Sequence, residues 1–305
     1  LVYNVKDKPP FGKTLVFALQ QLLAILAATI AVPAVVGNGM SQSAALFGAG
    51  VGTIVYLLFT KFRSPVFLGS SFAFIGSMQV AFAGAYASAV GGYAGLLVGA
   101  VFAGLVYVVI ALVVKAAGVK WVNKLMPAVV VGPTVAIIGL SLAGNAVGDA
   151  LHGIGAGNVM NLTGALSLIC ALVTLGTVIV CSVYAKKTLK TIPFIIGILA
   201  GYALATVFTL IGMATDNSAM QLISWEGFKN MNWVPNFAFV KAFKGFKDLT
   251  GAYIGTIAVA YVPVAFVVFA EHLADHKNIS TIIEKDLLED PGLDKTLLGD
   301  GVGSI

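Results

Sequence analysis

Long apolar stretches without charge recur along the whole chain and constrain its fold more than any other feature. The stretch 251–270, for example, contains twenty residues and no charged side chain. A helix of about 20 apolar residues crosses the ~30 Å hydrocarbon core of a bilayer. Only 10% of the 305 residues are charged and 59% are hydrophobic, whereas soluble domains are about 25% charged. The sequence therefore predicts an all-α polytopic membrane protein.

Hydropathy predicts eight membrane spans. Their approximate limits are 14–36, 43–60, 66–84, 86–114, 125–147, 162–185, 191–213 and 250–275. The chain begins without Met and ends just after a polar loop, where a further apolar segment begins. We therefore expect it to be part of a longer protein.

The basic residues predict which ends of the spans face the cytoplasm. Fourteen of the 18 basic residues precede the first span or follow the second, fourth, sixth and eighth spans. Because cytoplasmic loops are enriched in Lys and Arg, this side is expected to be cytoplasmic, together with the N-terminus. The other four lie in the connection 214–249, which mixes aromatic and basic residues. That composition suits an extracytoplasmic interfacial segment, with a solvated loop as the alternative.

Composition also excludes several kinds of site. The net charge of +5 comes from dispersed residues without a basic stripe, so nucleic acid is not an expected partner. Cys170 and Cys181 are eleven residues apart in one span, roughly 16 Å along a helix, which is too far for a disulfide. We expect both to be apolar packing residues and predict no metal site.

Two spans contain residues that interrupt helices. Pro65 and the Gly-Ser-Ser group at 69–71 precede the apolar part of the third span, so 65–74 is predicted to be non-helical. Non-helical backbone at membrane depth can line a cavity and bind substrate there, although a tight loop is the alternative. Pro127 and Pro133 in the fifth span predict a kinked helix. In the fourth span Gly91, Gly95, Gly99 and Ala103 form a small-residue face, which favours close intramolecular packing or a dimer contact.

Glu271 ends the apolar stretch of the eighth span and is the first candidate for function. An ionisable residue at membrane depth costs about 2.5–3.5 kcal/mol and usually faces a pathway or a partner. Asp275 is four residues later, on the same helix face, and such a pair could hold a proton or could simply mark the helix end. His272 lies on another face. Gln20 and Gln21 of the first span could bond to other helices or line a cavity.

Three segments together resemble a known family. LGSSFAFI at 68–75, FAEHLADH at 269–276 and EKDLLEDPGLDKTLLGDG at 284–301 resemble the bacterial uracil permeases of the nucleobase/ascorbate transporter family, also called nucleobase:cation symporters. The resemblance extends over the whole chain and includes LQQLLAILAATIAVP at 19–33.

The resemblance implies an inverted-repeat fold of seven plus seven spans with a core domain and a gate domain. Residues 1–13 would be the cytoplasmic N-terminus, and 14–213 the first repeat, with spans 1–4 in the core and 5–7 in the gate. Residues 214–249 would be the extracytoplasmic connection, 250–275 the eighth span, and 276–305 a cytoplasmic loop and the start of the ninth span. The third segment would include a short β-strand. The tenth segment, with its additional substrate-binding acid, would lie beyond this sequence.

The resemblance also implies roles for individual residues. Glu271 matches the acid that hydrogen-bonds the base, Phe72 the aromatic residue of the third segment, and Ala28 the small residue beside the substrate. Asp275 falls where the uracil permeases have a His linked to proton coupling, and Gln21 replaces the His of the usual Gln-His pair. Gln20, Gln21, Ser71 and His272 are supporting candidates.

The expected function is therefore proton-coupled import of a nucleobase, above all uracil, across the inner membrane. The proton gradient would supply the energy without a cofactor, and the expected partners are the base, the lipid bilayer and a second copy of the chain. A xanthine or purine permease of the same family is the nearest alternative. An intramembrane enzyme lacks its motifs in this sequence, and a channel would need charge rings or polar seams that the spans lack.

Overall fold

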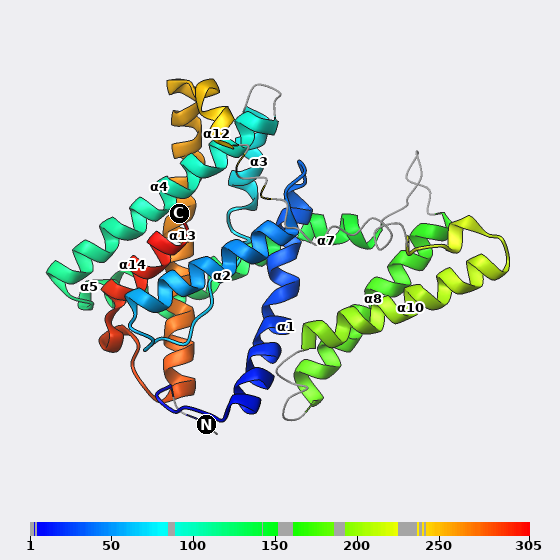
Figure 1. Cartoon of the computed structure of the whole chain (residues 1–305), viewed down its shortest axis with the longest axis horizontal. Coiled ribbons are helices and arrows are strands. Elements are labelled where there is room, and N and C mark those ends of the chain that lie inside the picture. Colours follow the sequence, from blue (N-terminus) through cyan, green and yellow to red (C-terminus); the bar gives the residue numbers. More distant parts are fainter. Residues whose placement is uncertain are drawn as a thin grey trace. The chain divides into compact units, whose positions relative to one another are not determined.

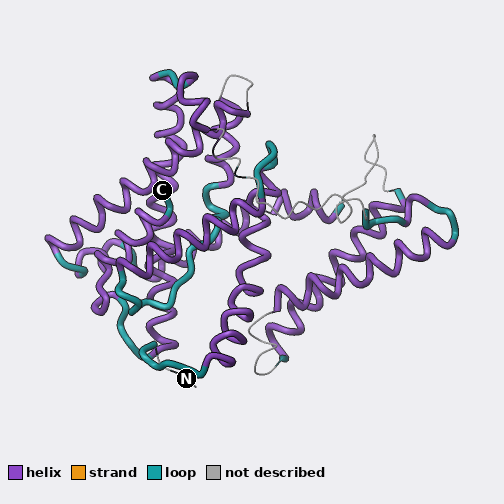
Figure 2. The backbone as a smooth tube through the Cα atoms, in the orientation of Figure 1, coloured by secondary structure: helices purple, strands orange, loops and turns teal. Residues whose placement is uncertain are grey.

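The computed structural model describes residues 3, 5–84, 89–141, 143–151, 161–185, 193–224, 237, 240 and 242–305, and all regular structure among them is helical (Figure 2). The chain divides into two compact units, which are described separately below. Unit 1 comprises residues 1–10, 28–140 and 235–305, and unit 2 comprises residues 11–27 and 141–234.

Six of the described helices are long and apolar enough to cross a membrane, so the chain is a multi-pass membrane protein. They are α1 (Phe11–Val36), α2 (Gln42–Phe59), α4 (Ala89–Ala117), α8 (Leu162–Tyr184), α10 (Pro193–Ala214) and α13 (Gly251–Ile283). They correspond to the first, second, fourth, sixth, seventh and eighth predicted spans. The main difference is at α13, which continues past residue 275 to Ile283 because its polar last turns remain hydrogen-bonded as a helix.

The third predicted span does not form a single long helix. Helix α3 (Ile75–Gly84) covers only the second half of the third span, and the predicted non-helical segment 65–74 is confirmed. In the fifth span the structure describes α6 (Ala128–Ser141), which contains Pro133, and α7 (Ala143–Ala150), and residue 142 lies outside the described residues. The short helix α5 (Lys120–Leu125) precedes them.

The short β-strand expected in the third segment is not observed among the described residues. A strand requires a neighbouring strand with which to exchange backbone hydrogen bonds. Here the Leu68 amide donates instead to the side-chain oxygen of Thr53 on α2, at 3.0 Å. The Thr53 hydroxyl lies 3.3 Å from the Leu68 carbonyl, so this part of the segment is fixed to a helix.

In unit 1, α13 packs against α3, α4 and α14 (Leu293–Gly303) (Figure 1). The small-residue face predicted on α4 packs within the chain, because a Cβ at Gly95 would meet Tyr253 and one at Gly99 would meet Tyr261. The Tyr253 hydroxyl donates to the Ala81 carbonyl at 2.6 Å, and Ser77 donates to the Ala260 carbonyl at 2.7 Å. These bonds fasten α3 to α13.

Helix α14 lies between α2 and α4. A Cβ at Gly52 would be 2.6 Å from the carbonyl oxygen of Gly303, and a Cβ at Gly104 would be 2.6 Å from that of Gly301. Buried Leu293 and Leu297 continue this contact into an apolar cluster with Phe269 and Leu273 of α13. A short helical turn, η4 (Leu288–Gly292), connects α13 to α14.

Part of the predicted interfacial connection belongs to unit 1 and packs against its helices. The 3-10 turn η3 (Phe246–Asp248) follows α12 (Ala242–Gly245), in which both terminal residues are buried. A Cβ at Gly245 would meet the Val90 carbonyl of α4, so α12 approaches α4 closely. The tryptophans Trp225 and Trp233 lie outside the described residues.

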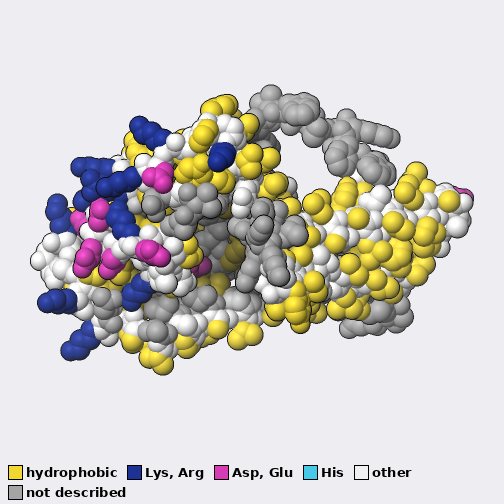
Figure 3. All heavy atoms as spheres, turned by 90° about the horizontal axis from the view of Figure 1, so that it is seen from below, with side chains coloured by type: hydrophobic (Ala, Val, Ile, Leu, Met, Phe, Trp, Pro, Cys, Tyr) yellow, Lys and Arg dark blue, Asp and Glu magenta, His cyan; other side chains and the backbone are white. Residues whose placement is uncertain are grey.

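Unit 2 is built on a hairpin of α8 and α10. A Cβ at Gly197 or Gly201 would meet Val178 or Thr174 of α8, so the two helices are in close contact. The turn η1 (Ser218–Met220) is joined to α8 by a hydrogen bond from Thr163 to the Ala219 carbonyl, at 2.9 Å. Figure 3 shows a largely hydrophobic surface over α8 and α10, as expected for helices that face lipid.

Candidate functional site

Two acidic side chains on α13 form the centre of the candidate site. Glu271 is half-buried and Asp275 is exposed, one helical turn further along. Neither carboxylate has a hydrogen bond to the part of the chain that the structure describes. Both therefore keep their acceptor capacity for a ligand that presents N–H groups.

His272, between the two acids in sequence, is fixed by α14. Its Nδ1 atom lies 2.9 Å from Oδ2 of Asp300 and its Nε2 atom 3.2 Å from Oγ1 of Thr296. The His272 side chain is 4% exposed and that of Asp300 is 18% exposed, so this contact is largely shielded from water and lipid. His272 thus anchors the acid-bearing helix to α14.

One turn later, His276 connects α13 to α2. Its Nδ1–H group donates to the His272 carbonyl at 2.8 Å, so its Nε2 atom accepts a hydrogen bond from the Tyr56 hydroxyl, also at 2.8 Å. Tyr56 in turn accepts from Ser64 at 2.7 Å. All three side chains are fully buried. The candidate site is therefore fixed on one side by α14 and on the other by α2.

The third segment approaches both α1 and α13. Ser70 donates to the Thr29 carbonyl of α1 at 3.1 Å, next to the exposed Ala28. Phe74 stacks on Tyr261 of α13 with ring centroids 5.5 Å apart. Phe72 and Ser71 are half-buried in the non-helical segment, and no hydrogen bond or ring contact among the described residues joins them to Glu271.

Two further candidates from the sequence, Gln20 and Gln21, belong to the other compact unit. Gln20 is half-buried and Gln21 is exposed, and both belong to unit 2, whereas Glu271 belongs to unit 1. Cys170 and Cys181 are both free cysteines of α8. Within the described ranges, no group of three or more His, Cys, Asp or Glu side chains could hold a metal ion.

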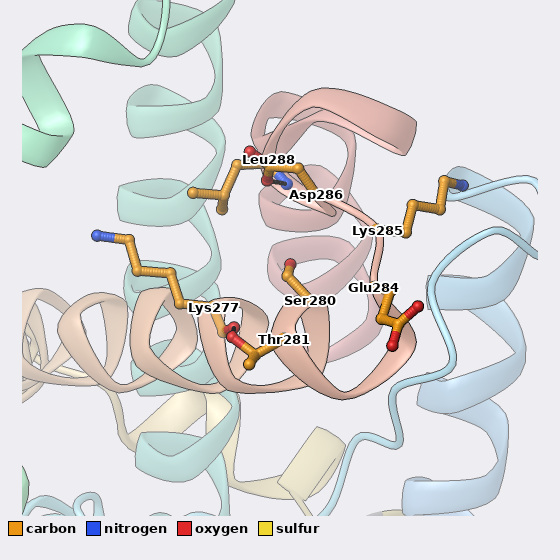
Figure 4. A pocket seen from close by; sticks show the side chains of 7 residues that line it. All are labelled: Lys277, Ser280, Thr281, Glu284, Lys285, Asp286 and Leu288. Carbon is orange, nitrogen blue, oxygen red and sulfur yellow. Dashed lines mark hydrogen bonds between the residues drawn. The ribbon is translucent and has the colours of Figure 1, made fainter. Parts of the chain in front are cut away.

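A polar pocket of about 510 Å³ lies beyond the acids, at the C-terminal end of α13 (Figure 4). Its lining residues are Lys277, Ser280, Thr281, Glu284, Lys285, Asp286 and Leu288. The amino groups of Lys277 and Lys285 point to opposite sides, so they do not converge on one anion (Figure 4). We therefore place the candidate site at Glu271 rather than in this pocket.

An ion cluster joins the loop after α2 to the loop after α13. Asp290 lies 2.8 Å from Lys285 and 2.9 Å from Arg63. The hydrogen bond from Lys285, and then that from Arg63, lowers the pKa of Asp290 to about 2. These loops were both predicted to be cytoplasmic, and the cluster places them on the same side of unit 1.

Sequence reasoning named Glu271, Asp275 and His272 but missed Asp300, Thr296 and Tyr56, which lie on other helices. The signal for Asp300 was its position between Gly299 and Gly301, because two glycines flanking a charge indicate a close helix contact. No comparable signal marked Tyr56.

Comparisons with known proteins agree with the resemblance seen in the sequence. The model of a family described as "Permease family" matches residues 12–305. The chain is 38% identical over 307 aligned positions to the uracil permease of Bacillus caldolyticus, covering 100% of this chain and 64% of that protein. The uracil permeases of Bacillus subtilis and Escherichia coli K12 are 36% and 31% identical, each over 99% of this chain and over 64% and 63% of their own lengths. The chain thus spans slightly less than two thirds of these relatives.

Proposed function

The chain belongs to the Permease family, and from this membership we propose that it is part of a proton-coupled symporter that imports a nucleobase, with uracil as the preferred base. The names of three relatives, all uracil permeases, support this substrate. Transport rather than catalysis is the activity we propose. The inner membrane, with the N-terminus in the cytoplasm, is the proposed location.

The observation that carries the proposal is a carboxylate, Glu271, that has no hydrogen-bond partner among the described residues and that ends the apolar stretch of α13. Uracil presents ring N–H donors and carbonyl acceptors on one plane. The Glu271 carboxylate can accept from the N–H groups, and backbone amides of the non-helical segment 65–74 can donate to the carbonyls. In this proposal the Phe72 ring covers the face of the base, and Ala28 lies beside the base at one edge of the site. Ser71 and His272 are supporting residues in this proposal, and Gln20 and Gln21 are retained as candidates from the sequence.

We further propose that Asp275 links transport to the proton gradient. It lies one turn from Glu271, and a carboxyl group that gains and loses a proton during the cycle can use the membrane potential. One charge moved through 100 mV is worth about 2.3 kcal/mol. The inverted repeat and a homodimer are parts of the same proposal, as are the domain limits given above.

Uptake of radiolabelled uracil by the complete protein, in cells without their own uracil permease, tests the proposal. We expect Glu271→Gln to reduce uracil affinity about tenfold to a hundredfold, because a hydrogen bond to a charged group contributes about 1.5–3 kcal/mol. Glu289→Gln is a matched control, because it makes the same chemical change at an exposed position away from the site.

Normal uracil binding by Glu271→Gln would contradict the assignment of the acid. Competition with unlabelled xanthine and other purines tests the substrate. If a purine competes better than unlabelled uracil, the transporter assignment remains and the preferred base is wrong.

A further inference from the structure

The ring of His272 is held by side chains from two other helices. Asp300 and Thr296 of α14 each hydrogen-bond one ring nitrogen. Tyr107 of α4 meets the ring at right angles, with centroids 5.8 Å apart. A ring fixed at both nitrogens has a defined protonation state, which can be deduced from its partners.

Counting donors and acceptors assigns a proton to each nitrogen. The ionised carboxylate of Asp300 can only accept, so Nδ1 of His272 donates to it. The Thr296 hydroxyl has one proton, and it donates that proton to the Leu293 carbonyl at 3.1 Å. Its oxygen is then an acceptor for Nε2 of His272. With both nitrogens donating, the ring is an imidazolium.

The surroundings of His272 are compatible with a positive charge. The titratable groups in contact with the ring are Asp300 of α14, Tyr107 of α4 and His276 of α13. Glu271 and Asp275 are close along α13, and Tyr56 of α2 contacts His276. His276 stacks on His272 with centroids 4.0 Å apart, where a second positive ring would be repelled. We therefore assign the neutral form to His276, whose Nε2 atom then accepts from the Tyr56 hydroxyl. One cation therefore lies against the carboxylate of Asp300, with Glu271 and Asp275 close along the same helix and no second cation against it.

We propose that Asp300 and Thr296 are positioning residues that hold His272 as an imidazolium. This places a fixed positive charge beside Glu271 and Asp275 and locks α14 to the helix that carries them. The inference rests on the proposed function only where uracil binding is the readout. Its structural part, the charged pair, stands independently.

A double-mutant cycle in the complete protein tests the pair. His272→Gln and Asp300→Asn each leave an unpaired buried polar or charged group, whereas the double variant removes both charges. We expect each single variant to lower uracil affinity and the melting temperature. If the two losses of uracil affinity were independent, the loss in the double variant would be their product. We expect the double variant to bind uracil about tenfold better than that product predicts. Asp248→Asn, an exposed position with the same chemical change, is the control. Additive effects on both readouts would overturn the charged pair.

Thr296 is tested by two substitutions of similar size. Thr296→Ser keeps the hydroxyl and should retain uracil affinity, whereas Thr296→Val removes the acceptor for Nε2 and should lower it. Equal affinities for these two variants would contradict the role of the hydroxyl.

Nitrogen NMR of wild-type protein with labelled histidine measures the number of protons on the His272 ring directly. It needs no variant, so a folding defect cannot obscure the result. The chain contains three histidines, which makes assignment tractable. Two protons on the His272 ring at neutral pH are expected, and a single proton would overturn the proposal. If the wild-type protein fails to bind uracil, the proposed function is wrong, while this proton count still decides the inference.

Discussion

Tyr56 shows how a single hydroxyl can hold two elements together. It donates to His276 of α13 and accepts from Ser64 in the loop after α2, and all three side chains are buried. Removal of one partner from a buried pair leaves the other without compensation for its lost hydration. The stability of this region should therefore depend on one oxygen atom.

We predict that Tyr56→Phe lowers the free energy of unfolding by about 1–3 kcal/mol, because it leaves Nε2 of His276 and Oγ of Ser64 without this partner. Thermal unfolding of the purified protein in detergent measures the effect. Tyr202→Phe on α10, where the ring is 46% exposed, removes the same atom and should change stability by less than about 0.5 kcal/mol. Equal melting temperatures for the two variants would show that the Tyr56 hydroxyl is not important for stability.

The proton-coupling role proposed for Asp275 can be tested separately from the substrate-binding role proposed for Glu271. We expect Asp275→Asn to retain uracil binding within about threefold but to lose accumulation driven by the gradient, because the amide cannot exchange a proton. Uptake with and without a protonophore measures this loss. Asp248→Asn should remain sensitive to the protonophore. Gradient-driven accumulation by Asp275→Asn would assign proton coupling to another group.

Asp290 gives the protein a predictable acid sensitivity. Its folded pKa, about 2, lies below its ordinary value of 3.8, so folding favours the ionised form. The stabilisation is fully present above about pH 4 and is lost as the pH falls toward 2. Melting temperatures across this range should fall more steeply for the wild type than for Asp290→Asn, and high salt should reduce the difference because the cluster is exposed. Parallel curves of melting temperature against pH for the two proteins at low salt would show that the ion cluster does not stabilise the fold.

At the scale of the element, glycines determine how closely the helices approach. Gly52 of α2 faces the backbone of Gly303 on α14, and a backbone carbonyl cannot rotate away as a long side chain can. Gly50, on the same helix, has nothing within 4 Å of an added Cβ. The two positions therefore form a natural pair for comparison.

We predict that Gly52→Ala destabilises the protein by about 1–3 kcal/mol through overpacking, whereas Gly50→Ala is neutral or slightly stabilising. Melting temperatures in detergent distinguish the two. A neutral Gly52→Ala would mean that α14 can move away from α2 at little cost.

Sequence periodicity and length predicted the elements that depend on local composition. Six spans were located because about 20 apolar residues suffice to identify a membrane helix. The non-helical start of the third segment was signalled by Pro65 and Gly69, but its bond to Thr53 was not, since that contact depends on tertiary packing. The same limit applies to the site. Glu271 and Asp275 share a helix face by spacing alone, whereas the Asp300 partner of His272 is 28 residues away on another helix.

At the scale of the whole molecule, the distribution of basic residues predicts one orientation in the membrane. Lys244 lies in the connection predicted to be extracytoplasmic, and Glu284 in a loop predicted to be cytoplasmic, and both are exposed. We expect a membrane-impermeant maleimide added to intact cells to label Lys244→Cys but not Glu284→Cys, in a background with Cys170 and Cys181 replaced by Ala. Permeabilised cells should label both. The reverse result in intact cells would invert the topology.

The two hydrogen bonds between α3 and α13 have a mechanical consequence. Tyr253 and Ser77 each donate to the backbone of the opposite helix, at positions about two helical turns apart along α13. Two separate bonds resist rotation of one helix about the other, which a single bond would allow. In the proposed transport cycle, a displacement of α13 should then carry α3 and Glu271 with it as a single rigid body. Spin labels on α3 and α13 would keep a constant separation throughout the cycle, and a change in that separation would contradict this coupling.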